Sequence, residues 1–166
     1  MRKIAIILPG DKLPLPSVKG GAVESLVQCL LDYNEKYHTY NFVVFSVYNE
    51  EAALKSRSYK HTDFKYINTD SLNYKLKQVF RWIYNRFFPY IGNQFINSVM
   101  NGMDTDYDYV LIENAPWFVI PLKRKMNMSM VQHLHNNYLG ITSSFNQQTV
   151  SYTHLRATRQ AEISYA

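Results

Sequence analysis

The sequence of 166 residues has a single cysteine and no long apolar run. One cysteine cannot form an intrachain disulfide, and the lack of a disulfide framework agrees with a reducing compartment. Cys29 lies within an apolar helical pattern, which predicts a small, buried hydrophobic side chain. The apolar run Ile4 to Leu8 is too short for a signal sequence or a bilayer span. We therefore predict a cytoplasmic protein that is soluble or bound peripherally to the cell membrane.

Several functional signatures are also missing. The glycine pair Gly20-Gly21 fits neither the dinucleotide fingerprint G-x-G-x-x-G nor the P-loop, which argues against nicotinamide dehydrogenases and P-loop NTPases. No RRM, KH or helix-turn-helix pattern is present, so we predict no nucleic-acid partner. His133 and His135 lie two apart on one strand face, as in an H-x-H metal pair. No cluster of further ligands supports that pair, so we predict no metal and no cofactor.

Apolar runs alternate with helical patterns along the chain, and 46% hydrophobic with 19% charged residues is a globular composition. Continuous apolar runs are typical of parallel strands that are buried on both faces. This alternation predicts an α/β fold, a Rossmann-like parallel sheet with helices on both faces. Strands are expected at residues 4–8, 42–47, 64–67, 107–112 and 128–135, with helices at 22–34, in 71–102 (split near Pro89 and Gly92) and from 115.

Ligands of open parallel sheets bind beyond the carboxyl ends of the strands. The segments expected there are 9–21, 46–49, 68–70, 113–114 and 135–137. In the first of them, Gly20 and Gly21 directly precede a helix, so backbone N–H groups and the helix dipole favour an anion such as a phosphate. The alternative is that the two glycines only form the turn. Glu113 and Asn114 are candidates for binding hydroxyl groups, with helix capping as the alternative.

Three motifs together resemble family 4 retaining glycosyltransferases, over residues 3 to about 145. They are Gly20-Gly21-Ala22-Val23-Glu24 after a Pro-rich loop, Ile112 to Pro116 after the fourth strand, and His133 to Asn137 after the fifth. The resemblance implies the N-terminal, acceptor-side half of a two-domain GT-B enzyme that uses a nucleotide sugar. A C-terminal domain would then bind most of the donor.

The same resemblance implies roles for individual residues. Gly20 and Gly21 correspond to the glycine loop near the donor diphosphate, and His135 to the histidine near the reacting centre. Glu113, Asn114 and Asn136 are the other expected substrate-binding residues. We expect hexose transfer to a glycan or lipid-linked acceptor in cell-surface polysaccharide synthesis. The alternatives are a GT-B sugar-nucleotide epimerase and a non-catalytic Rossmann-like binding module.

The segment from Ser71 to Met103 has basic and aromatic side chains and no acidic residue. Such a segment fits the interface of an anionic membrane. The alternative is a core helix whose aromatic stripe packs on the sheet while its basic residues are solvated. The cations are Lys75, Lys77, Arg81 and Arg86, and the aromatic residues interleaved with and just after them are Tyr74, Phe80, Trp82, Tyr84, Phe87, Phe88 and Tyr90.

The composition changes after residue 149. The run from Val150 to Ala166 resembles translated adapter sequence. We therefore expect an incomplete acceptor-side domain over residues 1–149 and a non-native tail over 150–166. The alternative is an ordinary helix that begins near Thr153.

Overall fold

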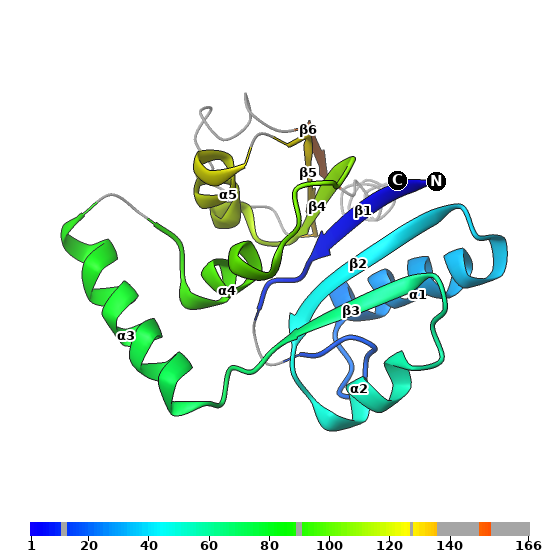
Figure 1. Ribbon diagram of the computed structural model, residues 1–166, viewed down its shortest axis with the longest axis horizontal. Helices are drawn as coiled ribbons and strands as arrows, with labels where there is room; N and C mark the ends of the chain where they lie inside the picture. Colours follow the sequence, from blue (N-terminus) through cyan, green and yellow to red (C-terminus); the bar gives the residue numbers. More distant parts are fainter. Residues whose placement is uncertain (11–12, 89–90, 127, 136–149, 154–166) are drawn as a thin grey trace, which may run out of the picture.

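The computed structural model describes residues 1–10, 13–88, 91–126, 128–135 and 150–153. Six strands form one sheet in the order β3-β2-β1-β4-β5-β6, and every pairing is parallel (Figure 1). The α/β, Rossmann-like fold predicted from the alternating pattern is confirmed. The strands are β1 Arg2–Ile7, β2 Tyr40–Val47, β3 Thr62–Ile67, β4 Tyr109–Glu113, β5 Met130–Leu134 and β6 Val150–Thr153.

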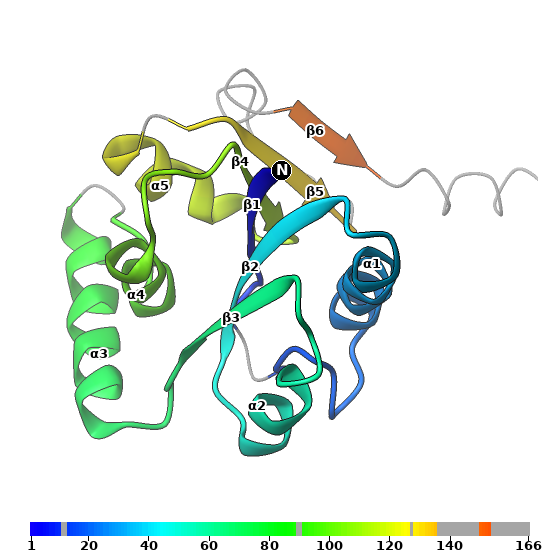
Figure 2. The same cartoon turned by 45° about the vertical axis from the view of Figure 1, so that its right-hand side comes forward.

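Helices cover both faces of this sheet (Figure 2). One core, with Val27 and Leu31, lies between the sheet and the long helix α1. The other, with Phe95 and Phe118, lies beneath the short helices on the opposite face. The helices are α1 Ala22–Tyr37, α2 Glu50–Ser56, α3 Leu72–Phe87, α4 Gln94–Gly102, the 3-10 helix η1 Pro116–Phe118 and α5 Val119–Lys125.

The predicted split of the helical segment 71–102 is confirmed, with α3 ending at Phe87 and α4 beginning at Gln94. Ser71 caps α3 through a hydrogen bond to the backbone N–H of Tyr74, and Asn93 caps α4 in the same way. Gly92 has a φ of 87°, a conformation that a side chain would strain. Among the described residues, no helix has both the length and the apolar character needed to cross a bilayer.

One expectation for α1 is wrong, because Cys29 is exposed rather than buried. Leu26, Leu30 and Tyr33 also lie toward solvent, and the buried side of the helix is the neighbouring one. Two residues of this buried side are polar, so the pattern of apolar residues in the sequence did not identify it as the buried side. Its members are Glu24, Val27, Leu31 and Asn34.

The first four residues of the segment that we interpret as a non-native tail form β6, which pairs with β5 from Val131 to Leu134. Thr153 is the last residue of this strand, and the alternative helix that begins near Thr153 would lie beyond it. Residues 154–166 lie outside the described part of the chain. A short edge strand can form whether the tail is native or not, so the non-native origin of the tail stays a prediction. The assignment of residues 1–149 to half of a GT-B fold also stays a prediction.

Candidate functional site

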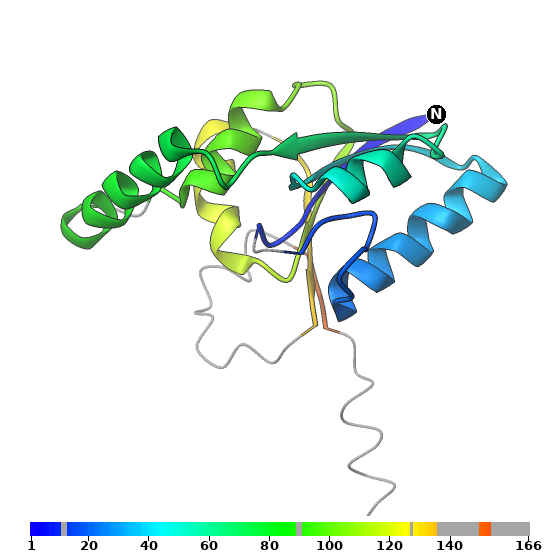
Figure 3. The ribbon, with the colours of Figure 1, turned by 90° about the horizontal axis from the view of Figure 1, so that it is seen from below.

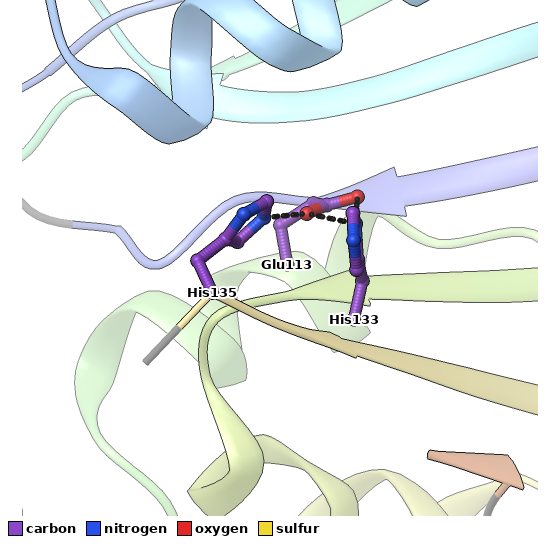
Figure 4. A group of neighbouring side chains, drawn as sticks. All are labelled: Glu113, His133 and His135. Atoms are coloured by element: carbon purple, nitrogen blue, oxygen red, sulfur yellow. Dashed lines mark hydrogen bonds and ion pairs between the residues drawn. The ribbon is translucent and has the colours of Figure 1, made fainter. Parts of the chain in front are cut away.

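Two histidines and one glutamate meet where β4 and β5 end (Figure 4). The parallel pairing of the two strands sets Glu113 opposite His133. His135 follows the last residue of β5, two positions beyond His133, and its side chain therefore lies on the same face. The Glu113 Oε2 atom is 2.8 Å from His135 Nε2 and 3.1 Å from His133 Nδ1.

The Glu113 carboxylate is almost fully buried, with 1% of the residue exposed. A buried carboxylate is stable only when hydrogen-bond donors surround it. The two imidazoles supply such donors, and both rings keep about a fifth of their side chains exposed. A neutral His135 that donates from Nε2 to Glu113 retains a lone pair on Nδ1 for a further group. The cluster therefore presents an oriented base at the sheet edge.

The expectation that Glu113 binds a substrate hydroxyl directly does not match this burial. Its carboxylate contacts the two histidines instead, so it acts on a ligand only by orienting and polarising the two imidazoles. Helix capping, the alternative for Glu113 and Asn114, is also not observed. The residue before η1 is Ala115, and no side chain caps that helix.

Asn114 connects the ends of β4 and β5. It adopts a left-handed conformation with φ 49°, which asparagine tolerates better than most residues. Its backbone N–H donates to the His133 carbonyl at 2.7 Å, and its Oδ1 atom accepts the His135 N–H at 3.3 Å. Asn114 is thus a positioning residue, because it holds the backbone on both sides of the histidine pair.

Among the described residues, this cluster is also a group of side chains that could hold a metal ion. Two histidines and a carboxylate are a known zinc ligand set, and their ligand atoms all lie within 4.8 Å of one another. Tetrahedral zinc with bonds of about 2.0 Å would separate its ligand atoms by about 3.3 Å. The 2.8 Å contact between Glu113 and His135 is shorter and matches a charge-assisted hydrogen bond. The absence of a metal from the working site stays a prediction.

Gly20 and Gly21 lie at the N-terminus of α1, on the same edge and face of the sheet as the cluster. Leu111, two residues before Glu113, packs into the core beneath α1, which identifies the shared face. Gly21 has a φ of 120°, and a Cβ atom there would collide with the Glu24 carboxylate. Gly20 has a φ of 77° and open space around it. Gly21 is therefore needed for the turn, whereas Gly20 leaves room for a ligand.

The buried Glu24 changes the electrostatics of this loop. Its side chain lies in the first turn of α1, next to Gly21, where an internal anion interacts favourably with the helix dipole. A ligand phosphate at this position would meet that carboxylate as well as the backbone N–H groups. The sequence-based argument for an anion considered the N–H groups and the helix dipole but not this carboxylate.

A polar cleft of about 530 Å³ lies at the carboxyl ends of β1, β2 and β3. Its volume is within the range typical of small-molecule sites. It joins three of the five segments predicted to meet at this edge, and the other two form the histidine cluster. The described residues that line the cleft are Gly10, Lys19, Val47, Tyr48, Asn49, Thr69, Asp70, Tyr74, Lys75, Gln78 and Asn93.

Sequence reasoning missed two features of this edge. It did not join Glu113 to His133 and His135, although all three come from the ends of neighbouring strands. It also did not place the inner side of α3, through Tyr74 and Gln78, in the wall of the cleft. Asn136 lies outside the described residues.

Neither the protein-family models nor the curated proteins compared with the chain gave a match.

Proposed function

We propose that this chain supplies the acceptor side of a retaining hexosyltransferase. The enzyme would move a sugar from a nucleotide sugar to a glycan or lipid-linked acceptor in cell-surface polysaccharide synthesis. The observation that carries the proposal is the position of His135: it follows β5 at the carboxyl edge, and the buried Glu113 holds its Nε2 atom at 2.8 Å. The described residues of the three sequence motifs that resemble family 4 glycosyltransferases lie at that edge.

In this proposal His135 accepts a hydrogen bond from the acceptor hydroxyl through Nδ1. The acceptor oxygen forms its bond to the anomeric carbon as the bond from that carbon to the diphosphate breaks. Glu113 fixes the ring and stabilises positive charge on it as the hydroxyl proton is drawn toward Nδ1. The polar cleft beyond β1 to β3 suits the hydroxyl-rich body of an acceptor.

Stabilising the departing diphosphate requires cations or N–H donors aimed at it. Gly20 offers open space for one part of the donor, but Glu24 opposes extra negative charge there. We therefore propose that a second Rossmann-like domain binds most of the nucleotide sugar. The cytoplasm is the proposed compartment, because the single cysteine provides no disulfide framework.

The test uses the natural gene that encodes residues 1–149 and its protein product. The proposal requires a second Rossmann-like domain and sugar transfer that depends on an added acceptor. His135→Ala should lower kcat by about 10²-fold or more, the usual contribution of a positioned acid or base. Glu113→Gln should lower it less, because an amide still accepts one hydrogen bond from an imidazole.

His61→Ala is the matched control, because His61 lies before β3 at the opposite, amino-terminal edge of the sheet. It should leave kcat unchanged. Wild-type turnover in His135→Ala would remove this residue from the site. Interconversion of free nucleotide sugars without an acceptor would indicate the epimerase. Ligand binding without turnover, in a gene product that lacks a second domain, would indicate the binding module.

A further inference from the structure

Helix α3 attaches to the protein through its polar side. Gln78 Oε1 accepts the backbone N–H of Gln94 at 2.7 Å, and Arg81 Nε donates to the Gln94 side chain at 3.1 Å. Asn85 accepts the N–H of Ile91 and donates to the carbonyl of Gly92. Tyr74 adds a partly buried contact with the core. Residues 74, 78, 81 and 85 follow helical spacing, so these contacts lie on one face.

The opposite face of α3 is apolar and lies in solvent. No residue of this helix is buried, and Leu72 and Phe87 remain 80% and 76% exposed. At about 100° per residue, the apolar side chains fall within about 100° of the helix circumference. The alternative of a core helix is therefore wrong for α3, of whose aromatic residues Tyr74 packs partly against the core. The exposed apolar stripe consists of Leu72, Leu76, Val79, Phe80, Ile83 and Phe87.

Cations flank this apolar stripe. Lys75 and Arg86 lie on one side of it and Lys77 on the other, all three exposed, and the helix contains no acidic residue. Trp82 and Phe88 add two large exposed rings at its margins. Figure 3 shows α3 extending away from the sheet.

We propose that this outward face of α3 is a docking surface for an anionic lipid bilayer. Apolar side chains between Lys and Arg are the composition of helices that lie in the headgroup region. Anionic headgroups attract such flanking cations, whereas a second copy of α3 would place like charges together. The helix would lie on the bilayer without crossing it.

The proposal rests on the exposure and charge of α3, and it is independent of sugar transfer. It has one structural consequence for the site. The inner side of the same helix lines the polar cleft through Tyr74 and Gln78, with Lys75 at the margin between the two sides, so the cleft would open close to the lipid headgroups.

Intrinsic fluorescence gives a direct test on the full 166-residue chain. The protein has two tryptophans, Trp82 on α3 and Trp117 in η1, so Trp117→Phe leaves Trp82 as the only reporter. We expect vesicles of phosphatidylcholine with 30% phosphatidylglycerol to shift its emission to shorter wavelength. Vesicles of phosphatidylcholine alone should cause little or no shift.

Vesicle sedimentation of variants then locates the surface. Leu76→Ser/Phe80→Ser should weaken binding to the anionic vesicles by at least tenfold. Lys75→Glu/Arg86→Glu should weaken it at least as much, and 0.5 M salt should weaken binding of the unchanged protein. Leu26→Ser/Leu30→Ser on the exposed side of α1 is the matched control and should bind normally. Far-ultraviolet circular dichroism verifies that each variant is folded.

Three results would overturn the proposal. The first is no binding to anionic vesicles by folded protein. The second is binding that the α1 control weakens as much as the α3 variant does. The third is self-association, measured by analytical ultracentrifugation, that Leu76→Ser/Phe80→Ser abolishes while vesicle binding is absent; the stripe would then be a dimer contact. None of these readouts involves sugar transfer, so each is separate from the test of His135.

Discussion

Helices α1 and α3 have the same length, 16 residues, yet they use their two sides in opposite ways. The side of α1 that faces the sheet buries Val27 and Leu31 in the core. The side of α3 that faces the protein is polar and makes hydrogen bonds to α4 and the segment before it. An apolar stripe on a helix therefore identifies a contact surface, but the surface it contacts need not belong to the same chain.

The two helices also differ in what holds them in place. Burial of side chains stabilises α1, and each methylene group removed from water adds about 0.8 kcal/mol. Hydrogen bonds of half-buried side chains hold α3, and each adds only about 0.5–1.5 kcal/mol net. We therefore expect α3 to tolerate changes to its apolar side that α1 would not.

The largest effect should come from truncating one leucine on each helix. Leu31 is fully buried and Leu76 is 71% exposed. We expect Leu31→Ala to lower the free energy of unfolding by about 2–4 kcal/mol, because it leaves a cavity. Leu76→Ala should change it by less than about 0.5 kcal/mol. Urea denaturation measures both values, and equal losses would show that α3 is packed as tightly as α1.

A smaller effect on stability should distinguish the polar residue that anchors α1, which titrates, from those that anchor α3, which do not. Glu35 ties the last turn of α1 to the start of β3, where it accepts the backbone N–H groups of Lys60 and His61. Burial acts to raise the pKa of Glu35, but these N–H donors outweigh it and the pKa falls below its ordinary value of 4.5. The carboxylate therefore stabilises the fold above pH 4.5, and this contribution is lost as the pH falls through the lowered pKa.

We accordingly expect Glu35→Gln to be less stable than the unchanged chain at pH 7, by under about 1 kcal/mol because the site is partly exposed. The difference should shrink as the pH drops below 4.5. The anchors Gln78 and Asn85 of α3 do not titrate, so Gln78→Ala should cost the same at both pH values. Denaturation at pH 7 and pH 3 checks both expectations, and a pH-independent loss in Glu35→Gln would contradict the first.

The smallest effect is expected at Cys29, on the exposed side of α1. Cys29→Ser should change the free energy of unfolding by less than about 0.5 kcal/mol, because the side chain leaves no cavity behind. The thiol of the folded protein should also react with a disulfide reagent at a rate near that of the unfolded chain. Slow labelling would show that the outer side of α1 is covered after all.

The sequence was sufficient to predict five of the six described strands, because continuous apolar runs such as Ile4 to Leu8 are typical of buried parallel strands. It also located the helix break near Pro89 and Gly92, since these residues act locally. It did not predict β6. It failed for the sides of α1, because Glu24 and Asn34 are buried with partners that periodicity does not reveal. Asn34, for example, bonds the backbone of Tyr40 through both its amide nitrogen and its oxygen.

The candidate site was predictable only in part. Strand order brings Glu113 and His135 to one edge, and the rule that ligands bind beyond the carboxyl ends of strands identified both. Their contact depends on the register that pairs Glu113 with His133, which single-strand patterns do not contain. The same limit applies to α3, where the pattern indicated an amphipathic helix but left open which side meets the protein.

The left-handed backbone conformation of Asn114, after β4, affects the position of His135 after the neighbouring strand β5. A residue at this position must tolerate a left-handed backbone conformation. It must also carry a short side chain that accepts a hydrogen bond from the backbone N–H of His135, which follows the neighbouring strand. Glycine meets the first requirement and threonine the second, whereas aspartate meets both. Replacing Asn114 by a residue that fails either requirement would therefore displace the imidazole ring of His135 without altering any atom of that ring.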